Sequence, residues 1–200
     1  MGRIVMFNHV TADGYFAAAD GAVDWMVPED ELDRAVAEHM PDSGTLLLGR
    51  RTYELFAAYW PHALDDPQTA PDPHDPERRS AEIRTMAVWL NEATKLVVSR
   101  TLEAVTWRNS HLLRELDPRE IGALKRERGE DILIFGSGSI VSQLTQHGLI
   151  DEYRFVVNPL LLGSGRPLIS DVSRHLRLEL LESRAFPSGV VLMRYARAER

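Results

Sequence analysis

The chain has 200 residues, of which 44% are hydrophobic, and this fits one large domain better than two small ones. Its net charge of −7 argues against a nucleic-acid or membrane-surface partner, because both favour a basic face. The absence of cysteine excludes disulfides, thiolate metal sites and a cysteine nucleophile. We find neither a signal-peptide pattern nor the roughly 18 apolar residues of a membrane helix. We therefore expect a single cytoplasmic domain over 1–200.

Short apolar strands alternate with helical patterns through the first three quarters of the chain. Strands are expected at 3–10, 45–48, 95–99 and 132–135, and helices after Pro28, over 50–59, around 82–90 and over 140–149. Strand-like segments then follow at 153–158, 176–185 and 189–196, with no helix among them. This pattern predicts an α/β fold in which a mostly parallel sheet, covered by helices on both faces, ends in antiparallel strands.

The stretch 61–80 has a different composition from the rest of the chain. It holds five prolines, four aspartates and two histidines in twenty positions, so we expect an exposed insertion. His62 and His74 stand near aspartates, but the proline-rich setting favours solvated side chains, and we predict no metal site. His9, near the end of the first strand, is compatible with a substrate contact or with a hydrogen-bonded core histidine.

The strongest single feature is a Gly-Ser-Gly turn that links a buried strand to a helix. The apolar strand before it ends at Gly136, and the helix begins directly after Gly138. Glycine lets the backbone approach a ligand closely, and a helix N-terminus attracts an anion. The third glycine of the common dinucleotide fingerprint is missing, so the turn alone is also compatible with a plain tight connection.

Two further strand ends carry residues suited to phosphate. One strand leads into Gly49, Arg50, Arg51 and Thr52, and another leads into Ser99, Arg100 and Thr101. Each alone is compatible with a solvated arginine and a helix cap. Because the carboxyl ends of parallel strands meet at one edge of a sheet, the three ends could converge on one molecule. The planar fork of arginine suits a 2′-phosphate, which favours NADPH over NADH.

These segments resemble dihydrofolate reductase and, more closely, the C-terminal reductase domain of the bacterial riboflavin-biosynthesis deaminase-reductase and its stand-alone relatives. The matching segments are 11–15, 48–52, 98–101, 135–139 and 148–167, the last being the most specific. The resemblance covers the chain except 61–80. It implies a three-layer α/β/α dihydrofolate reductase-like fold, NADPH as cofactor, a pterin- or pyrimidine-type heterocycle as substrate, and a homodimer.

The resemblance also implies roles for individual residues. The pyrophosphate would be lined by Gly136, Ser137, Gly138 and Ser139, with further phosphate contacts from Arg50 and Thr52. The 2′-phosphate would be bound by Ser99 and Arg100. The set of residues expected to bind the cofactor also includes Gly49, Arg51, Thr101 and Ile140. The proton donor is expected to be Asp30, which follows a Trp-x-x-Pro-x-Asp pattern, although an acid there also complements a helix dipole. Asp13, beside the nicotinamide, and Asp24 are its competitors.

The nearest named activity implied by the resemblance is reduction of 5-amino-6-(5-phosphoribosylamino)uracil. The family often joins the reductase to a zinc deaminase, and because these 200 residues contain no cysteine, we expect no such domain among them. Two alternatives stay open. One is a dihydrofolate reductase-like enzyme with a different substrate, and the other is a non-catalytic NADP(H)-binding module.

Overall fold

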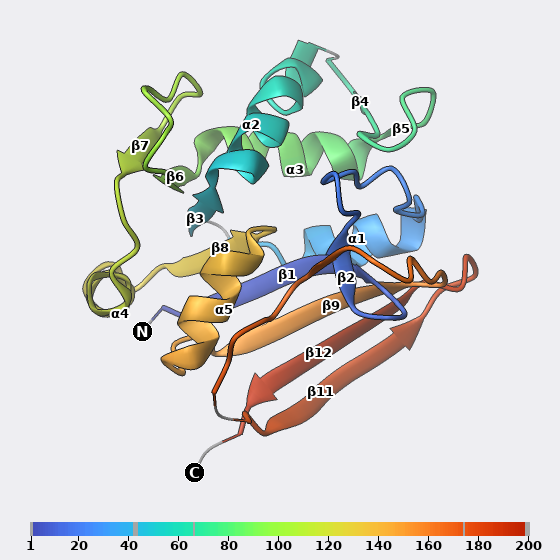
Figure 1. The fold of residues 1–200 in the computed structure, drawn as a ribbon. Coiled ribbons are helices and arrows are strands. Elements are labelled where there is room, and N and C mark those ends of the chain that lie inside the picture. Colours follow the sequence, from blue (N-terminus) through green and yellow to red (C-terminus); the bar gives the residue numbers. More distant parts are fainter. Residues whose placement is uncertain (1, 42–43, 66, 174, 199–200) are drawn as a thin grey trace.

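A computed structural model describes residues 2–41, 44–65, 67–173 and 175–198 (Figure 1). Its centre is an eight-stranded sheet in the order β11-β12-β9-β1-β8-β3-β6-β7. The strands are β1 (Ile4–Thr11), β3 (Gly44–Gly49), β6 (Thr94–Val98), β7 (Ser110–Leu113), β8 (Asp131–Phe135), β9 (Glu152–Asn158), β11 (Leu178–Ala185) and β12 (Val191–Arg197). The pairs from β9 to β7 are parallel, whereas β12 runs antiparallel to β9 and β11. The predicted mostly parallel sheet with antiparallel C-terminal strands is confirmed.

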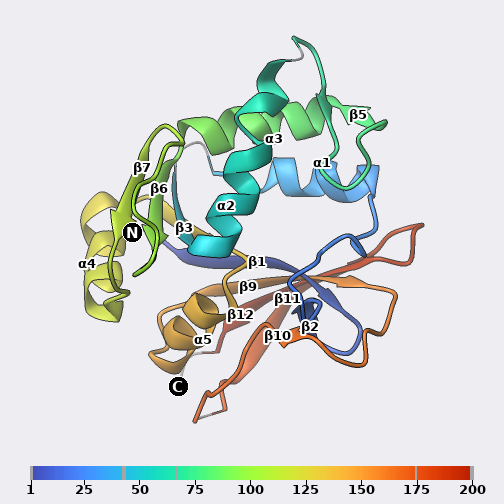
Figure 2. The same ribbon diagram turned by 45° about the horizontal axis from the view of Figure 1, so that its top comes forward.

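Helices cover both faces of this sheet (Figure 2). One layer contains α1 (Asp30–Glu38), α2 (Arg50–Tyr59) and α3 (Ala81–Glu92), and the other contains α4 (Pro118–Arg128) and α5 (Gly138–Gln146). The predicted three-layer α/β/α architecture is therefore confirmed. Among the described residues, no helix has the length and apolar character needed to cross a membrane.

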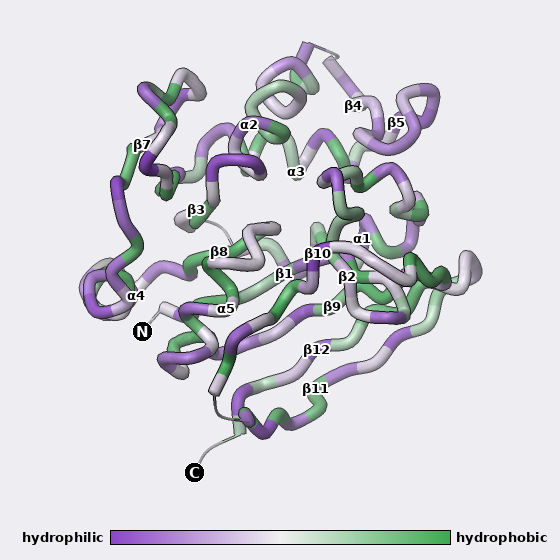
Figure 3. Tube along the Cα trace, in the orientation of Figure 1, coloured by the Kyte–Doolittle hydropathy of each residue, from purple (hydrophilic) through white to green (hydrophobic). Residues whose placement is uncertain are grey.

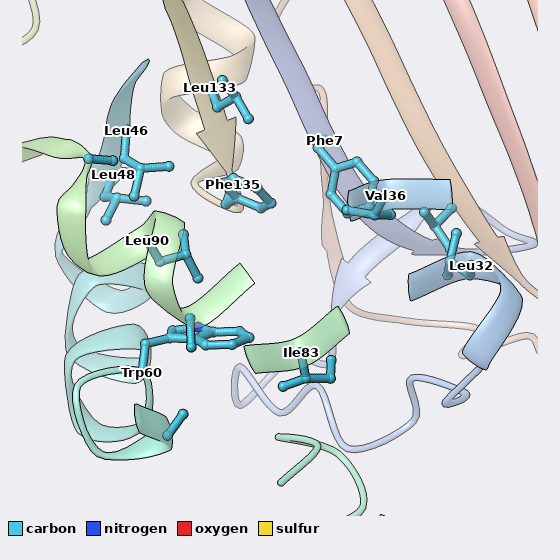
Figure 4. Close-up of a cluster of buried hydrophobic side chains, with 14 of the residues drawn as sticks. Phe7, Leu32, Val36, Leu46, Leu48, Trp60, Ile83, Leu90, Leu133 and Phe135 are labelled. Atoms are coloured by element: carbon cyan, nitrogen blue, oxygen red, sulfur yellow. The ribbon is translucent and has the colours of Figure 1, made fainter. Parts of the chain in front are cut away.

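The two faces of β1 contribute to separate hydrophobic cores. Phe7 packs with Phe135 and with residues of the α1–α3 layer (Figure 4), whereas Ile4 and Met6 belong to the core under α4 and α5. Successive side chains of a strand point to opposite faces, so both faces of β1 need apolar residues. This alternation also sends the neighbouring polar residues Asn8 and His9 in opposite directions.

Several elements were missed by the sequence pattern. α4 begins with a proline after Asp117, whose carboxylate accepts a hydrogen bond from the Arg119 amide at 2.7 Å, and it ends at the left-handed Gly129. These are ordinary helix start and stop signals. β7 was also missed, as was the small ribbon of β2 (Tyr15–Ala17) and β10 (Arg166–Pro167), whose strands are too short to show a period.

The insertion 61–80, expected to be exposed from its composition, contains short elements that the sequence pattern did not predict. It forms a 3-10 turn (His62–Asp65) and the ribbon of β4 (Ala70–Pro71) and β5 (Arg79–Ser80). Figure 3 shows β4, β5 and the segment between them mostly in hydrophilic colours. Even so, Ala63 and Ala70 are buried in the core beside α3, and Asp72 is buried as well. A few small buried side chains anchor the segment, and they are too few to be recognised from its overall composition.

Candidate functional site

The β3–α2 and β8–α5 turns form one continuous structure. The Gly49 amide donates to Ser137 Oγ at 2.6 Å, and that hydroxyl also lies 3.1 Å from Thr52 Oγ1. A Cβ on Gly49 would lie 2.7 Å from Ser137 Oγ, and one on Gly136 would lie 2.6 Å from Thr52 Oγ1. Both glycines are therefore required by the close approach of the turns. We call these turns, residues 49–52 and 136–139, the glycine cradle.

The helices that leave the glycine cradle lack the side-chain caps found elsewhere in the described chain. α1, α3 and α4 are capped by the side chains of Glu29, Ser80 and Asp117, whereas α2 and α5 have no side-chain cap hydrogen bond. Uncapped first turns keep amide donors and a positive dipole end for another acceptor. Ser137 also has φ 61° and ψ 63°, a left-handed conformation that costs about 1–2 kcal/mol in a residue with a side chain.

The third predicted strand end lies at the same edge, because β6 pairs with β3 and Val98 is opposite Gly49. Ser99 is buried there, and its hydroxyl accepts from the amides of Thr101 at 3.2 Å and Leu102 at 2.9 Å. The Ser99 side chain therefore stabilises its own turn. Arg100 and Thr101 are exposed beside it.

The other residues predicted to bind the cofactor differ in the exposure of their side chains. Arg50 and Arg51 are exposed at the start of α2, and Arg50 pairs with Glu54 at 3.2 Å. Ser139 is exposed in the first turn of α5, whereas the Ile140 side chain is buried in the core. A Cβ on Gly138 would lie 3.1 Å from the Pro167 carbonyl oxygen, so this glycine admits a close backbone contact.

Asn8 is a site residue that the sequence pattern did not reveal. It is 5% exposed, and its Oδ1 accepts a hydrogen bond from the Gly136 amide at 2.7 Å. Its buried Nδ2 has no hydrogen-bond partner among the described residues. A buried donor without a partner costs about 1–3 kcal/mol, so Asn8 holds the glycine cradle through Oδ1 while its Nδ2 stays enclosed behind it. The only available signal was a polar residue inside an otherwise apolar strand.

Asp13 lies in the loop after β1 and acts as a hydrogen-bond acceptor. Its carboxylate accepts from Thr11 Oγ1 at 2.5 Å, from the Leu162 amide at 3.2 Å and from the Gly163 amide at 2.7 Å. The hydrogen bond from the Thr11 hydroxyl is the largest of the effects that lower the pKa of Asp13. A lowered pKa keeps the group ionised, so these contacts favour loop positioning over proton donation.

Asp30 starts α1, and its side chain is 66% exposed. Its Oδ1 accepts a hydrogen bond from Arg78 Nε, a residue of the insertion, at 2.6 Å. The competitor Asp24 is also exposed. More buried is Asp33, one turn further along α1, where burial raises the pKa to about 6 against the opposing effect of Arg78. The geometry therefore favours neither Asp30 nor Asp24 as a protected proton donor.

Asn158, at the end of β9, connects three parts of the site. It is fully buried, and its Oδ1 accepts from the Val27 amide at 2.9 Å. The amide donor fixes which atom of the Asn158 side chain is oxygen, so Nδ2 must be the atom 3.3 Å from His9 Nδ1. Asn158 thereby ties β9 to β1 and to the segment before α1.

The order of the strands, the helices on both faces and the paired turns define the dihydrofolate reductase-like fold. The model of the RibD C-terminal domain matches residues 3–192. The chain therefore belongs to the RibD C-terminal domain family.

Several known proteins are similar to this chain in sequence or in structure. Uncharacterized protein YyaP of Bacillus subtilis (strain 168) is 29% identical over 195 residues, 96% of this chain and 94% of that protein. A protein of Shewanella sp. PV-4, assigned provisionally to riboflavin biosynthesis, has a TM-score of 0.70 and 22% identity over the whole of both chains. The diaminohydroxyphosphoribosylaminopyrimidine deaminase/5-amino-6-(5-phosphoribosylamino)uracil reductase of Thermotoga maritima has a TM-score of 0.63 and 17% identity, covering 98% of this chain and 57% of that one. At these identities the two structural matches show a shared fold.

Proposed function

We propose that this chain is an NADPH-dependent reductase of a pterin- or pyrimidine-type heterocycle. The observation that carries the proposal is the glycine cradle, where two uncapped helix N-termini meet at adjacent strand ends beside the unpaired Nδ2 of Asn8. Such an arrangement suits an anionic group that approaches the backbone closely. Membership of the RibD C-terminal domain family supports the same conclusion, and the nearest named activity is reduction of 5-amino-6-(5-phosphoribosylamino)uracil.

In this proposal, the chain binds and orients the cofactor. The amides of the glycine cradle would hold the pyrophosphate, and the exposed Arg100 would meet the 2′-phosphate as a planar fork. Bound NADPH supplies the hydride. Asp13 would hold the loop after β1 against the 162–163 turn, so that the nicotinamide end of the site keeps its shape.

A charge reversal tests the 2′-phosphate contact. Arg100→Glu is expected to weaken NADPH binding at least tenfold, about 1.4 kcal/mol, because a cation is replaced by a like charge. NADH, which lacks the 2′-phosphate, should bind the variant and the wild type equally. Titration of both dinucleotides, followed by protein fluorescence, measures the two effects.

The matched control is Arg119→Glu, the same charge change at an exposed position on α4. It should leave both affinities unchanged. Unaltered NADPH affinity in Arg100→Glu would reject the 2′-phosphate contact. Absence of saturable NADPH binding by the wild type would reject the reductase.

Asn8 offers a second test through a nearly isosteric change. Asn8→Asp keeps an acceptor for the Gly136 amide but replaces the unpaired Nδ2 donor with an oxygen. We expect NADPH affinity to fall about tenfold or more, because Asp places a negative charge behind the turn that is proposed to hold the pyrophosphate. The affinity is measured by titration and compared with the melting temperature of the same variant. A loss of stability without a loss of affinity would contradict a role in binding.

The second candidate is a non-catalytic NADP(H)-binding module. It is favoured by one observation, that Asp13 and Asp30 are both engaged in contacts with other parts of the chain. Saturable NADPH binding without oxidation across a panel of pterins and pyrimidines would support the module. Oxidation with any member of the panel would support the reductase.

Homodimerisation and a cytoplasmic location stay predictions. The surface that a second copy would use is the edge strand β11, which exposes Leu178, Leu180 and Leu181. Exposed apolar side chains on an unpaired strand edge are typical of a contact surface.

A further inference from the structure

The insertion reaches the carboxyl end of β1 through a pair of histidines. The rings of His9, from β1, and His74, from the segment between β4 and β5, have centroids 6.5 Å apart. His9 also contacts Phe7 edge-on at 6.0 Å, which places it on the α1–α3 face of the sheet. Asn8, on the opposite face, contacts the glycine cradle. Two consecutive residues of β1 therefore join the cofactor side of the site to the insertion.

His9 is a neutral hydrogen-bond donor. Asn158 Nδ2 lies 3.3 Å from His9 Nδ1, and a donor at that position favours the tautomer of His9 whose proton is on Nε2. Burial is the main cause that lowers the pKa of His9 to about 3, and the nearby His74 adds to it. Burial also lowers the pKa of His74. Both imidazoles are uncharged at neutral pH and offer planar faces and N–H groups rather than cations.

The insertion around this pair carries excess negative charge. Arg78 contacts three carboxylates, those of Asp30, Asp33 and Asp72. Asp72 also accepts the His74 backbone amide at 2.7 Å, so a carboxylate adjoins the histidine directly. Over its length, the insertion has four aspartates and one glutamate against two arginines, and Asp30 and Asp33 of α1 add two further carboxylates. The exposed Arg50, Arg51 and Arg100, in contrast, lie at the strand ends assigned to the cofactor.

We propose that the 61–80 insertion is the specificity element of this site, and that His9 and His74 select an uncharged planar heterocycle and disfavour one that carries a phosphate. Neutral imidazoles can stack on a heterocycle and donate to its oxo groups. A phosphate would bring two negative charges to a group of carboxylates, and this repulsion provides selectivity without a dedicated contact. The inference rests on the proposed function and narrows its substrate class to heterocycles without a phosphate, so it separates this chain from the nearest named activity, whose substrate is phosphorylated.

Two compounds that differ only in the phosphate provide the test. 5-Amino-6-(ribosylamino)uracil and its 5′-phosphate are titrated calorimetrically into the wild-type protein in the presence of NADP⁺. The compound without phosphate is expected to bind about tenfold more tightly. His74→Arg adds a cation at the histidine pair and should reduce this preference at least threefold.

His62→Arg is the matched control, because His62 belongs to the same insertion and its side chain is 76% exposed. It should leave the preference unchanged. Equal or tighter binding of the phosphate, no binding of either compound, or an unchanged preference in His74→Arg would overturn the inference. NADPH titration of the wild type separates the two proposals, since the reductase survives such a result if NADPH still binds.

Discussion

Gly136→Ala is expected to destabilise the protein by about 2–5 kcal/mol and to abolish measurable NADPH binding. Gly136 has φ +59°, and a Cβ there would lie 2.6 Å from Thr52 Oγ1 and 3.1 Å from Thr52 Cγ2. The left-handed conformation accounts for about 1–2 kcal/mol and the overpacking for a further 1–3 kcal/mol. Relief of the clash would separate the two turns of the glycine cradle, and binding depends on their joint geometry. Chemical denaturation and NADPH titration measure the two losses.

A control with the same backbone conformation separates strain from the contact. Gly129 has φ +69°, and a Cβ there would meet nothing within 4 Å. Gly129→Ala should therefore cost only about 1–2 kcal/mol, the conformational part alone, and should leave NADPH affinity unchanged. Equal effects of the two substitutions on stability and binding would show that the close approach to Thr52 has no role.

Glu152→Gln is expected to destabilise the protein by about 3–5 kcal/mol, because it leaves the buried guanidinium of Arg154 without its carboxylate, whereas Arg194 keeps Glu182 and Arg3 keeps Asp131. Glu152 is 3% exposed, and its carboxylate contacts Arg154 at 2.7 Å, Arg194 at 2.9 Å and Arg3 at 3.0 Å. Denaturant unfolding of the variant and the wild type at neutral pH measures the difference. An effect below about 1 kcal/mol, the level of a surface ion pair, would contradict this account.

The pH dependence of protein stability provides a second test of the role of Glu152. Burial by itself would raise the pKa of Glu152, but the hydrogen bonds and charges of Arg154 and Arg194 outweigh burial and hold the pKa below its ordinary value of 4.5. A lowered pKa in the folded state stabilises the protein above pH 4.5, and this stabilisation is lost as the pH falls through the lowered pKa. The difference in unfolding free energy between the wild type and Glu152→Gln should therefore become smaller in acid.

Glu182→Gln is the control for this substitution, because it removes a more exposed partner of Arg194. It should lower the free energy of unfolding by less than about 1 kcal/mol.

Much of the fold could be predicted from the sequence because the signals are local. The apolar runs of β1, β3, β6 and β8 and the helical spacing after them need only neighbouring residues to be recognised. β7 is short and α4 carries a weak apolar stripe, so neither was expected despite clear start and stop residues at α4. The few buried side chains that anchor the 61–80 insertion were not predicted, because composition averages over them.

In the candidate site, too, the local features could be predicted from the sequence and the long-range contacts could not. Glycines at strand ends and the arginines that follow them are local features, and the sequence by itself determined that the carboxyl ends of β3, β6 and β8 carry groups suited to phosphate. Only the tertiary structure decided that Ser137 bonds to Gly49, 88 residues away, and that Asn8 keeps an unpaired donor beside them. It also decided that Asp13 accepts a hydrogen bond from Leu162, 149 residues away, and that Asp30 accepts one from Arg78, 48 residues away. A side chain acquires its ionisation and its role from such distant partners, and no local pattern contains them.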